Sequence, residues 1–223
     1  MKKIPILNID SIKKHEEINM LHKQIPPVSY FENFKKIIRN EDMVAAKLLI
    51  QEAKIKNYDL NRHDEKTKYT LFHFVISRII ERNENDMLTI LKLLKESECD
   101  LNQSALDSFR NTPIHTASRR ALPKIVSWLL QNGAHADISD NTGQTPIDYV
   151  DKQLNCNKSH MTDVHKVKLI TVREILSDFL KENAIKKENH QVQIKSICRF
   201  GLFAVAITTA IVVRQVYPNI MNN

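Results

Sequence analysis

The feature that most constrains this chain is an internal repeat of a threonine-proline motif. The segment NTPIHTA at residues 111–117 recurs as QTPIDYV at residues 144–150, so Thr112 and Thr145 lie 33 positions apart. A fixed period of about 20 to 50 residues is typical of stacked repeats, in which each unit buries its apolar face against the next. The period therefore predicts an elongated solenoid.

The unit that begins at Thr112 fits a pair of helices. Thr112 is placed to cap the first helix, and Pro113 falls in its first turn, where a missing N–H costs nothing. Ile114 and Ala117 are three residues apart and share a face of this helix. The second helix should end at Gly133, which can adopt the left-handed turn. Its apolar stripe consists of Ile125, Val126, Leu129 and Leu130.

The stretch TPIHTASRRALPKIVSWLLQNGAHADISDNTGQTPID resembles the ankyrin repeat over its full length. The ankyrin period is also about 33 residues. This resemblance implies an all-α solenoid in which the histidines of the T-x-x-H positions, His73 and His115, hydrogen-bond to the neighbouring repeat. The structural motif positions that it assigns are Thr70, His73, Thr112, Pro113, His115, Gly133, Thr145 and Pro146.

Weaker copies of the motif lie upstream. YTLFHFVISRII at residues 69–80 keeps Thr70 and His73 but lacks the proline, and 42 positions separate Thr70 from Thr112. About nine residues are therefore extra relative to the ankyrin period, and the polar segment 81–87 is expected to hold most of them. An earlier helix pair is predicted by its apolar residues, which are Tyr30, Phe34, Ile37, Ile38, Val44, Ala45, Leu48 and Leu49.

These copies predict an all-α ankyrin solenoid of three to four helix-loop-helix repeats. The expected repeats span residues 27–61, 66–102, 108–140 and 141–183. The last unit is interrupted by a polar stretch at 155–162 and is expected to be a C-terminal cap, because terminal repeats are usually atypical. We expect residues 1–26 to form an N-terminal extension, 184–196 a basic linker and 218–223 a tail.

The C-terminal part carries the only strongly apolar run of the chain, residues 200–213, which contains no charge. Fourteen helical residues cover about 21 Å, but residues 197–217 would cover about 31 Å, enough for a bilayer core of about 30 Å. Arg199 and Arg214 flank the run and can reach the headgroups. We therefore predict a transmembrane helix at 197–217, with a helix packed on the last repeat as the alternative.

The basic residues before the uncharged run 200–213 outweigh the single Arg214 after it, which predicts a single-pass C-terminal anchor with the repeats in the cytosol. Without an anchor, we expect a cytoplasmic protein or a secreted effector. The Lys, Ile and Asn bias resembles ankyrin proteins of AT-rich intracellular bacteria. The segment 4–9 is too short for a signal-peptide core, so standard secretion is not expected.

The composition argues against two classes of function, nucleotide binding and nucleic-acid binding. Three glycines in 223 residues argue against nucleotide-binding loops, which use several close glycines to approach phosphate. The net charge of +7 is spread along the chain with carboxylates interleaved, so a nucleic-acid partner is not expected. We predict no cofactor.

A competing hypothesis is a metal-dependent or catalytic protein that uses the Cys/His loop at 155–165. This loop brings Cys156, His160, Asp163 and His165 close together in the sequence. The spacing is not that of a paired zinc finger, and no fourth ligand is evident. We therefore expect neither a metal site nor catalysis.

The function expected from the resemblance is protein–protein interaction through the loop tips and the inner surface of the first helices. Aromatic and arginine side chains are enriched at binding hot spots, which draws attention to Phe109 and Arg110. For Phe109, exposure and folding back onto the stack remain open alternatives. The candidate partner-binding residues are Lys68, Tyr69, Phe109, Arg110, Arg119, Arg120 and Asn141.

Overall fold

The computed structural model describes residues 28–156 and 161–216, with side chains described for 29–156, 161–189 and 191. Within these residues every regular element is a helix. The expected extension 1–26, the tail 218–223 and residues 157–160 of the Cys/His loop lie outside the described residues.

The helices come in successive pairs. The first unit contains α2 (Val28–Arg39) and α3 (Met43–Ile55), and the second contains α4 (Leu71–Ser77), the short 3-10 helix η1 (Glu81–Asn83) and α5 (Glu84–Glu96). The third contains α6 (Pro113–Arg119) and α7 (Pro123–Gln131), and the fourth begins with α8 (Pro146–Asn155) and the first turns of α9 (Asp163–Val216).

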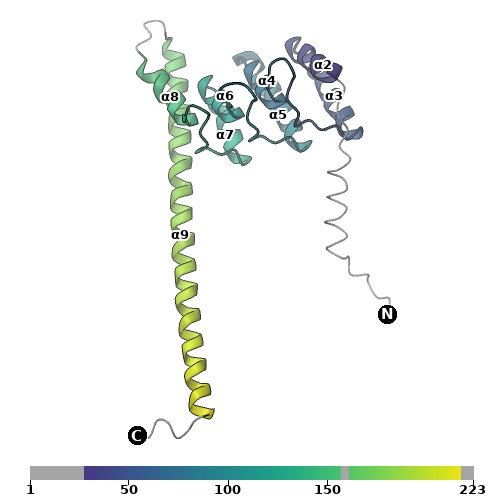
Figure 1. The fold of residues 1–223 in the computed structure, drawn as a ribbon. Coiled ribbons are helices and arrows are strands. Elements are labelled where there is room, and N and C mark those ends of the chain that lie inside the picture. Colours follow the sequence, from purple (N-terminus) through teal and green to yellow (C-terminus); the bar gives the residue numbers. More distant parts are fainter. Residues whose placement is uncertain (1–27, 157–160, 217–223) are drawn as a thin grey trace, which may run out of the picture. The chain divides into compact units, whose positions relative to one another are not determined.

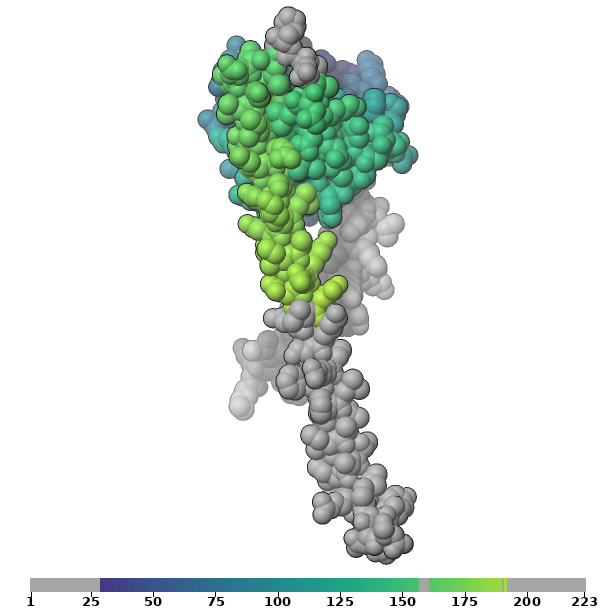
Figure 2. Space-filling view, turned by 90° about the vertical axis from the view of Figure 1, so that its left-hand side faces the viewer, coloured from purple at the N-terminus to yellow at the C-terminus, as the bar shows by residue number. Residues whose placement is uncertain are grey.

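Equivalent helices of successive units lie side by side (Figure 1). Helices α4, α6 and α8 pack in one row, and α3 packs on α5 in a second row. Figure 2 shows the end of this array, where the fourth unit stands in front of the third. The described units thus form the all-α repeat solenoid that the period predicts.

The core repeats from unit to unit. In the third unit the predicted stripe is confirmed, because Ile125, Val126 and Leu129 are completely buried, as are Ile114 and Ala117 of α6. Ala117 has little side-chain volume, which suits close packing between neighbouring first helices.

Most of the extra residues of the second unit lie in the polar segment 81–87, as expected. Compared with the third unit, three residues precede α5 as η1, four lengthen α5 itself and two lie in the loop that follows. The polar residues 81–87 are therefore helical. Asn83 accounts for part of this order, since its buried side chain accepts a hydrogen bond from the Ile80 N–H at 2.7 Å.

The first unit buries a different face of its second helix from the one predicted. Val44 and Leu48 were expected in the core, but they are 70% and 60% exposed. The core instead takes Ala46, Ile50 and Ala53, which lie on the opposite side of α3. Because α3 is apolar on two faces, the sequence pattern alone does not determine which face is buried.

The chain divides into two compact units, residues 1–176 and 177–223, and α9 contributes to both. Its first turns belong to the repeat array, where Leu169, Val172 and Leu176 are buried. The backbone remains helical through 184–196, where a linker was expected, and on to Val216. Among the residues that the structure describes, no helix is both long and apolar enough to cross a membrane.

Candidate functional site

The loops between successive units are ordered by short-range hydrogen bonds to an aspartate. In the loop after α7, Asp140 Oδ1 accepts hydrogen bonds from the N–H groups of Thr142 at 2.7 Å and Gln144 at 3.0 Å. In the loop after α5, Asp107 Oδ1 accepts from the N–H groups of Phe109 at 3.1 Å and Arg110 at 2.8 Å. These bonds give each loop a defined tip.

Each tip contains one residue with a left-handed backbone. Gly143 has φ of 78°, and its counterparts two residues before the other motif threonines are Lys68 at 62° and Arg110 at 53°. A residue with a side chain is strained in this region, whereas glycine adopts it freely. The same turn therefore recurs in three loops although only one retains glycine.

Neighbouring tips are joined by main-chain hydrogen bonds. The Leu106 N–H donates to the Lys68 carbonyl at 2.9 Å, and the Asn141 N–H donates to the Phe109 carbonyl at 2.9 Å. The Asn141 side-chain amide also donates to the Ser108 carbonyl at 3.2 Å. The three tips consequently form one continuous row.

His73 holds the loop after α5, the second of the three loops, at the end that leads into α6. Its Nε2 lies 2.7 Å from the Asn111 carbonyl oxygen, and its Nδ1 lies 2.7 Å from Thr70 Oγ1. Because the carbonyl can only accept, Nε2 carries the proton and Nδ1 accepts from the threonine hydroxyl. Burial lowers the pKa of His73 to about 4, so the ring is neutral at physiological pH.

His115 makes the same connection one unit further on. Its Nδ1 lies 2.8 Å from Thr112 Oγ1, and its Nε2 lies 3.1 Å from the Gln144 carbonyl oxygen. Burial lowers the pKa of His115 as well. In the fourth unit Asp148 takes this position and accepts from the Thr145 N–H at 2.7 Å, which caps α8 without reaching another unit.

Tyr149 of α8 supports the third loop from the other side. Its hydroxyl donates to Asp140 Oδ2 at 2.6 Å and lies 3.2 Å from Asn111 Oδ1. Burial alone would raise the pKa of Asp140, but hydrogen bonds from Tyr149, Thr142 and Gln144 outweigh it and lower the pKa to about 2. Burial and the bond to Asp140 raise the pKa of Tyr149 to about 12.

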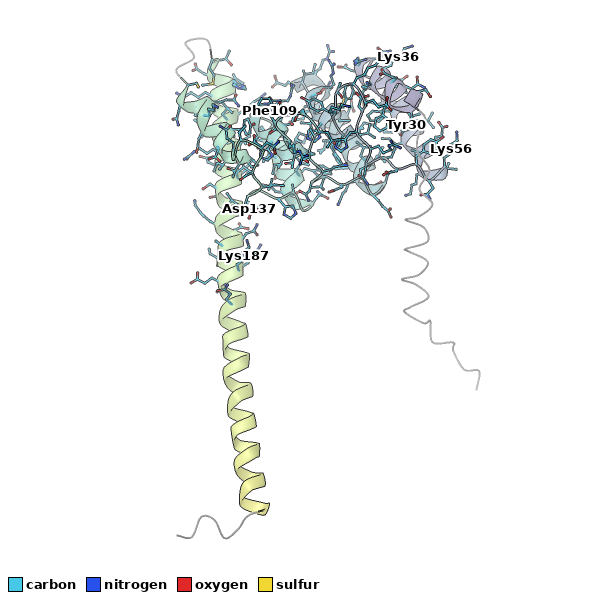
Figure 3. All side chains as sticks on the ribbon, in the orientation of Figure 1. Tyr30, Lys36, Lys56, Phe109, Asp137 and Lys187 are labelled. Carbon is cyan, nitrogen blue, oxygen red and sulfur yellow. The ribbon has the colours of Figure 1, made fainter. Side chains whose placement is uncertain are left out.

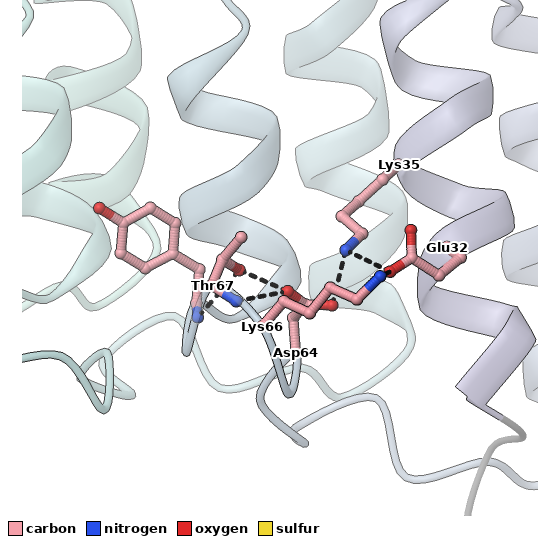
Figure 4. A network of polar contacts seen from close by, with 6 residues as sticks. Glu32, Lys35, Asp64, Lys66 and Thr67 are labelled. Carbon is pink, nitrogen blue, oxygen red and sulfur yellow. Dashed lines mark hydrogen bonds and ion pairs between the residues drawn. The ribbon is translucent and has the colours of Figure 1, made fainter.

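The first loop is anchored by a buried ion pair (Figure 4). Lys35 Nζ lies 2.7 Å from Asp64 Oδ1, and the two side chains are 4% and 8% exposed. Asp64 also accepts hydrogen bonds from the Thr67 N–H and hydroxyl. Burial alone would raise the pKa of Asp64, but the bonds from Lys35 and Thr67 outweigh it and lower the pKa to about 2.

The tips expose apolar and basic side chains together. Leu106 and Phe109 are 52% and 50% exposed, so Phe109 does not fold back into the stack (Figure 3). Lys68 and Arg110 are exposed beside them, and Tyr69 is half-buried against the ring of His73. We define the tip surface as Lys68, Tyr69, Leu106, Phe109, Arg110 and Asn141.

The structure separates Arg119 and Arg120 from this surface. Both lie at the C-terminal end of α6, whereas the loops meet its N-terminal end. Arg120 is half-buried and its Nη2 donates to the Ile79 carbonyl at 2.7 Å, which ties it to the second unit. Burial and the nearby Arg119 and Arg78 lower its pKa. Arg119 is exposed but remote from the tips.

Leu106 is the tip residue that the sequence reasoning missed. It lies in the segment SALDSF, which has no helical or strand periodicity, so no pattern distinguishes an exposed apolar residue from a buried one there. Its place at the tip follows only from the structure, in which the Leu106 N–H donates to the Lys68 carbonyl of the neighbouring loop.

The Cys/His loop does not gather into a site within the described residues. His160 lies outside them, and Cys156 is exposed. The described part of the chain contains no group of three or more histidine, cysteine, aspartate or glutamate side chains that could hold a metal ion.

The comparison with protein families finds a match in the middle of the chain. A family model described as ankyrin repeats (many copies) matches residues 97–150. This range runs from the end of α5 through α6 and α7 into α8, and it includes both complete threonine-proline motifs. The search of curated proteins finds no match to the sequence.

Proposed function

Because the chain is an ankyrin-repeat protein, we propose that it is a non-catalytic protein-interaction module. Its tip surface binds an acidic segment of a partner protein that carries an aromatic or aliphatic side chain. The observation that carries this proposal is the pair of half-exposed apolar residues, Leu106 and Phe109, beside the exposed cations Lys68 and Arg110.

The charge of the tips favours an acidic partner. The carboxylates of Asp64, Asp107 and Asp140 are occupied by hydrogen bonds within their own loops. In the first loop the exposed carboxylate is that of Glu65, whereas Asp64 is buried. The cations at the tips are therefore available to a carboxylate of a partner, and such charge complementarity raises the association rate and the specificity.

The order of the loops favours tight binding. Main-chain bonds join the tips, and the buried His73 and His115 hold the bases of the loops. A surface that is already ordered loses little conformational entropy when it binds, which is the general advantage of pre-organisation.

A displayed library of random peptides, selected on the full chain, tests this proposal. We expect enriched peptides that combine an aromatic or aliphatic residue with aspartate or glutamate. Phe109→Ala and Arg110→Ala should each weaken binding of an enriched peptide roughly thirtyfold, the effect of a hot-spot residue worth about 2 kcal/mol. Gln131→Ala, an exposed change at the end of α7, is the matched control. Equal affinity of the wild type and both tip variants would refute the proposal.

We also propose that residues 197–217 attach the protein to a membrane, with the repeats in the cytosol. Support comes from the sequence, in which residues 200–213 are uncharged between Arg199 and Arg214. Carbonate extraction of membranes from expressing cells tests this: the full chain should stay with the membrane, and a chain ending at Asn189 should be released. Release of both to the same extent would contradict it.

A further inference from the structure

Three arginines gather at the C-terminal ends of α4 and α6. Arg78 is the C-cap residue of α4, Arg119 is the last residue of α6 and Arg120 is its C-cap. Arg120 joins the two helix ends, because its Nη2 donates at 2.7 Å to the carbonyl of Ile79, the residue that follows Arg78. We define Arg78, Arg119 and Arg120 as the arginine cluster. It lies at the opposite end of α6 from the tip surface.

The charge of the arginine cluster is not balanced by carboxylates. Arg78 and Arg119 are exposed, and Arg120 is half-buried. In the described part of the chain, every ion pair involves a cation other than these three. The first carboxylate after Arg78, that of Glu81, lies 3.8 Å from Lys168 Nζ instead. Burial and the two neighbouring arginines both disfavour the charged form of Arg120 and lower its pKa.

Arg120 is only partly paired by the protein. Its Nη2 has the Ile79 carbonyl, but its Nε is buried and has no hydrogen-bond partner among the described residues. A buried N–H without a partner is costly, and a partly buried cation without an anion adds a further cost. An anion bound to the guanidinium group would offset the second of these costs.

The equivalent residue of the fourth unit shows that the link between units does not require a charge. Arg120 and Gln153 each lie eight residues after the motif threonine of their unit. Gln153 Nε2 donates to the Arg119 carbonyl at 2.9 Å, just as Arg120 donates to the Ile79 carbonyl. A neutral amide is therefore sufficient to hold the preceding unit. The positive charge of Arg120 needs another explanation.

An aromatic ring holds Arg78 and extends the positive surface toward the first unit. Arg78 Cζ lies 5.5 Å from the centroid of the Phe74 ring, and Arg39 Cζ of α2 lies 5.6 Å from the same centroid. A cation–π contact positions a guanidinium group but does not cancel its charge. Both arginines therefore remain able to attract an anion.

We propose that the arginine cluster binds a phosphate group, carried by a phosphorylated side chain of a protein or free in solution. Guanidinium groups present N–H donors in a planar fork that fits phosphate oxygens. A phosphorylated side chain offers three acceptor oxygens and a charge of about −1.5 to −2 at pH 7, which suits three cations better than a single carboxylate does. The site is separate from the tip surface, so it does not depend on the function proposed above.

Titration of the full chain with inorganic phosphate at constant ionic strength, followed by NMR of the arginine Nε–H groups, tests the proposal. Saturable shifts should appear at the arginine cluster. Arg120→Gln copies Gln153 and keeps a donor for the Ile79 carbonyl, yet it should weaken binding about tenfold or more, as should Arg119→Gln at an exposed position. Lys92→Gln removes the same charge from an exposed position of α5 and should bind phosphate like the wild type.

A tripeptide of glycine, serine and glycine, with and without phosphate on the serine, distinguishes the two sources. Tighter binding of the phosphorylated peptide than of inorganic phosphate would assign the site to a phosphorylated protein, and equal or weaker binding would assign it to soluble phosphate. Two results would overturn the proposal. One is unsaturated shifts of similar size at arginines throughout the chain, which indicate screening alone. The other is equal phosphate affinity of the wild type, Arg119→Gln and Arg120→Gln.

Discussion

At the scale of single residues, buried polar side chains order the loops of this protein. His73, His115 and Tyr149 each connect a helix of one unit to the main chain or side chains of a neighbouring loop. Unpaired polar groups are costly in a protein interior, so these bonds fix the loops in one arrangement. The exposed residues at the tips owe their positions to these buried partners.

The stability of the protein should fall as the pH is lowered from 6.5 to 5. The pKa of His73 is about 4 in the folded chain, against 6.5 when it is unfolded, so the unfolded chain binds more protons in this range. His73 alone should account for roughly 1 to 2 kcal/mol, and His115 acts in the same direction. The carboxylates of Asp64 and Asp140 matter only below about pH 4.

Urea denaturation at pH 7 and pH 5 measures this effect. His73→Gln should be less stable at pH 7 but should show a smaller loss between the two pH values. An unchanged pH dependence in His73→Gln would mean that another group is responsible.

Lys35→Met should lower the free energy of unfolding by about 3 kcal/mol or more, because it leaves the buried carboxylate of Asp64 without its cation. Lys36→Met is the control, since Lys36 is exposed on the same helix. Thermal or urea unfolding followed by circular dichroism gives both values. Similar small effects for the two variants would contradict a structural role of the ion pair.

At the scale of helices and turns, the recurring motif predicts more than local composition does. The helix start at Thr112 and Pro113, the stripe of α7 and the end at Gly133 all follow from residue chemistry. The face of α3 does not, because Val44 with Leu48 and Ala46 with Ile50 are equally consistent with a helical period. Only packing against α2 and α5 determines the buried face.

Lys68→Gly should stabilise the protein by about 0.5 to 1 kcal/mol. Lys68 has φ of 62° and an exposed side chain, so glycine relieves backbone strain without removing a buried contact. Glu65→Gly in the same loop, where the backbone is not left-handed, should be neutral or destabilising. Equal shifts of the urea midpoint in the two variants would argue against strain at Lys68.

At the scale of the whole repeat array, the function depends on how loops of successive units line up. The sequence could predict the tips, since the threonine motifs locate every loop. Arg119 and Arg120 were expected in the same binding surface as residues that close the first helix, but they lie at the C-terminal end of α6, whereas the loops meet its N-terminal end. Leu106 was missed because an exposed apolar loop residue has no periodic signal.

Tyr149→Phe should loosen the connection between the third and fourth units. The variant loses the bond from the hydroxyl to the Asp140 carboxylate, which should lower the free energy of unfolding by roughly 1.5 to 3 kcal/mol. The pKa of Asp140 should rise toward its usual value, which NMR titration can follow. An unchanged Asp140 pKa would show that the hydroxyl does not stabilise the carboxylate.

The most direct test of the central claim is hydrogen–deuterium exchange of the full chain with and without a library-selected peptide. The account predicts slower exchange in the three loops at 64–69, 104–111 and 139–143, with α3, α5 and α7 unchanged. Slower exchange confined to those outer helices, with no change in the loops, would contradict a binding surface at the tips.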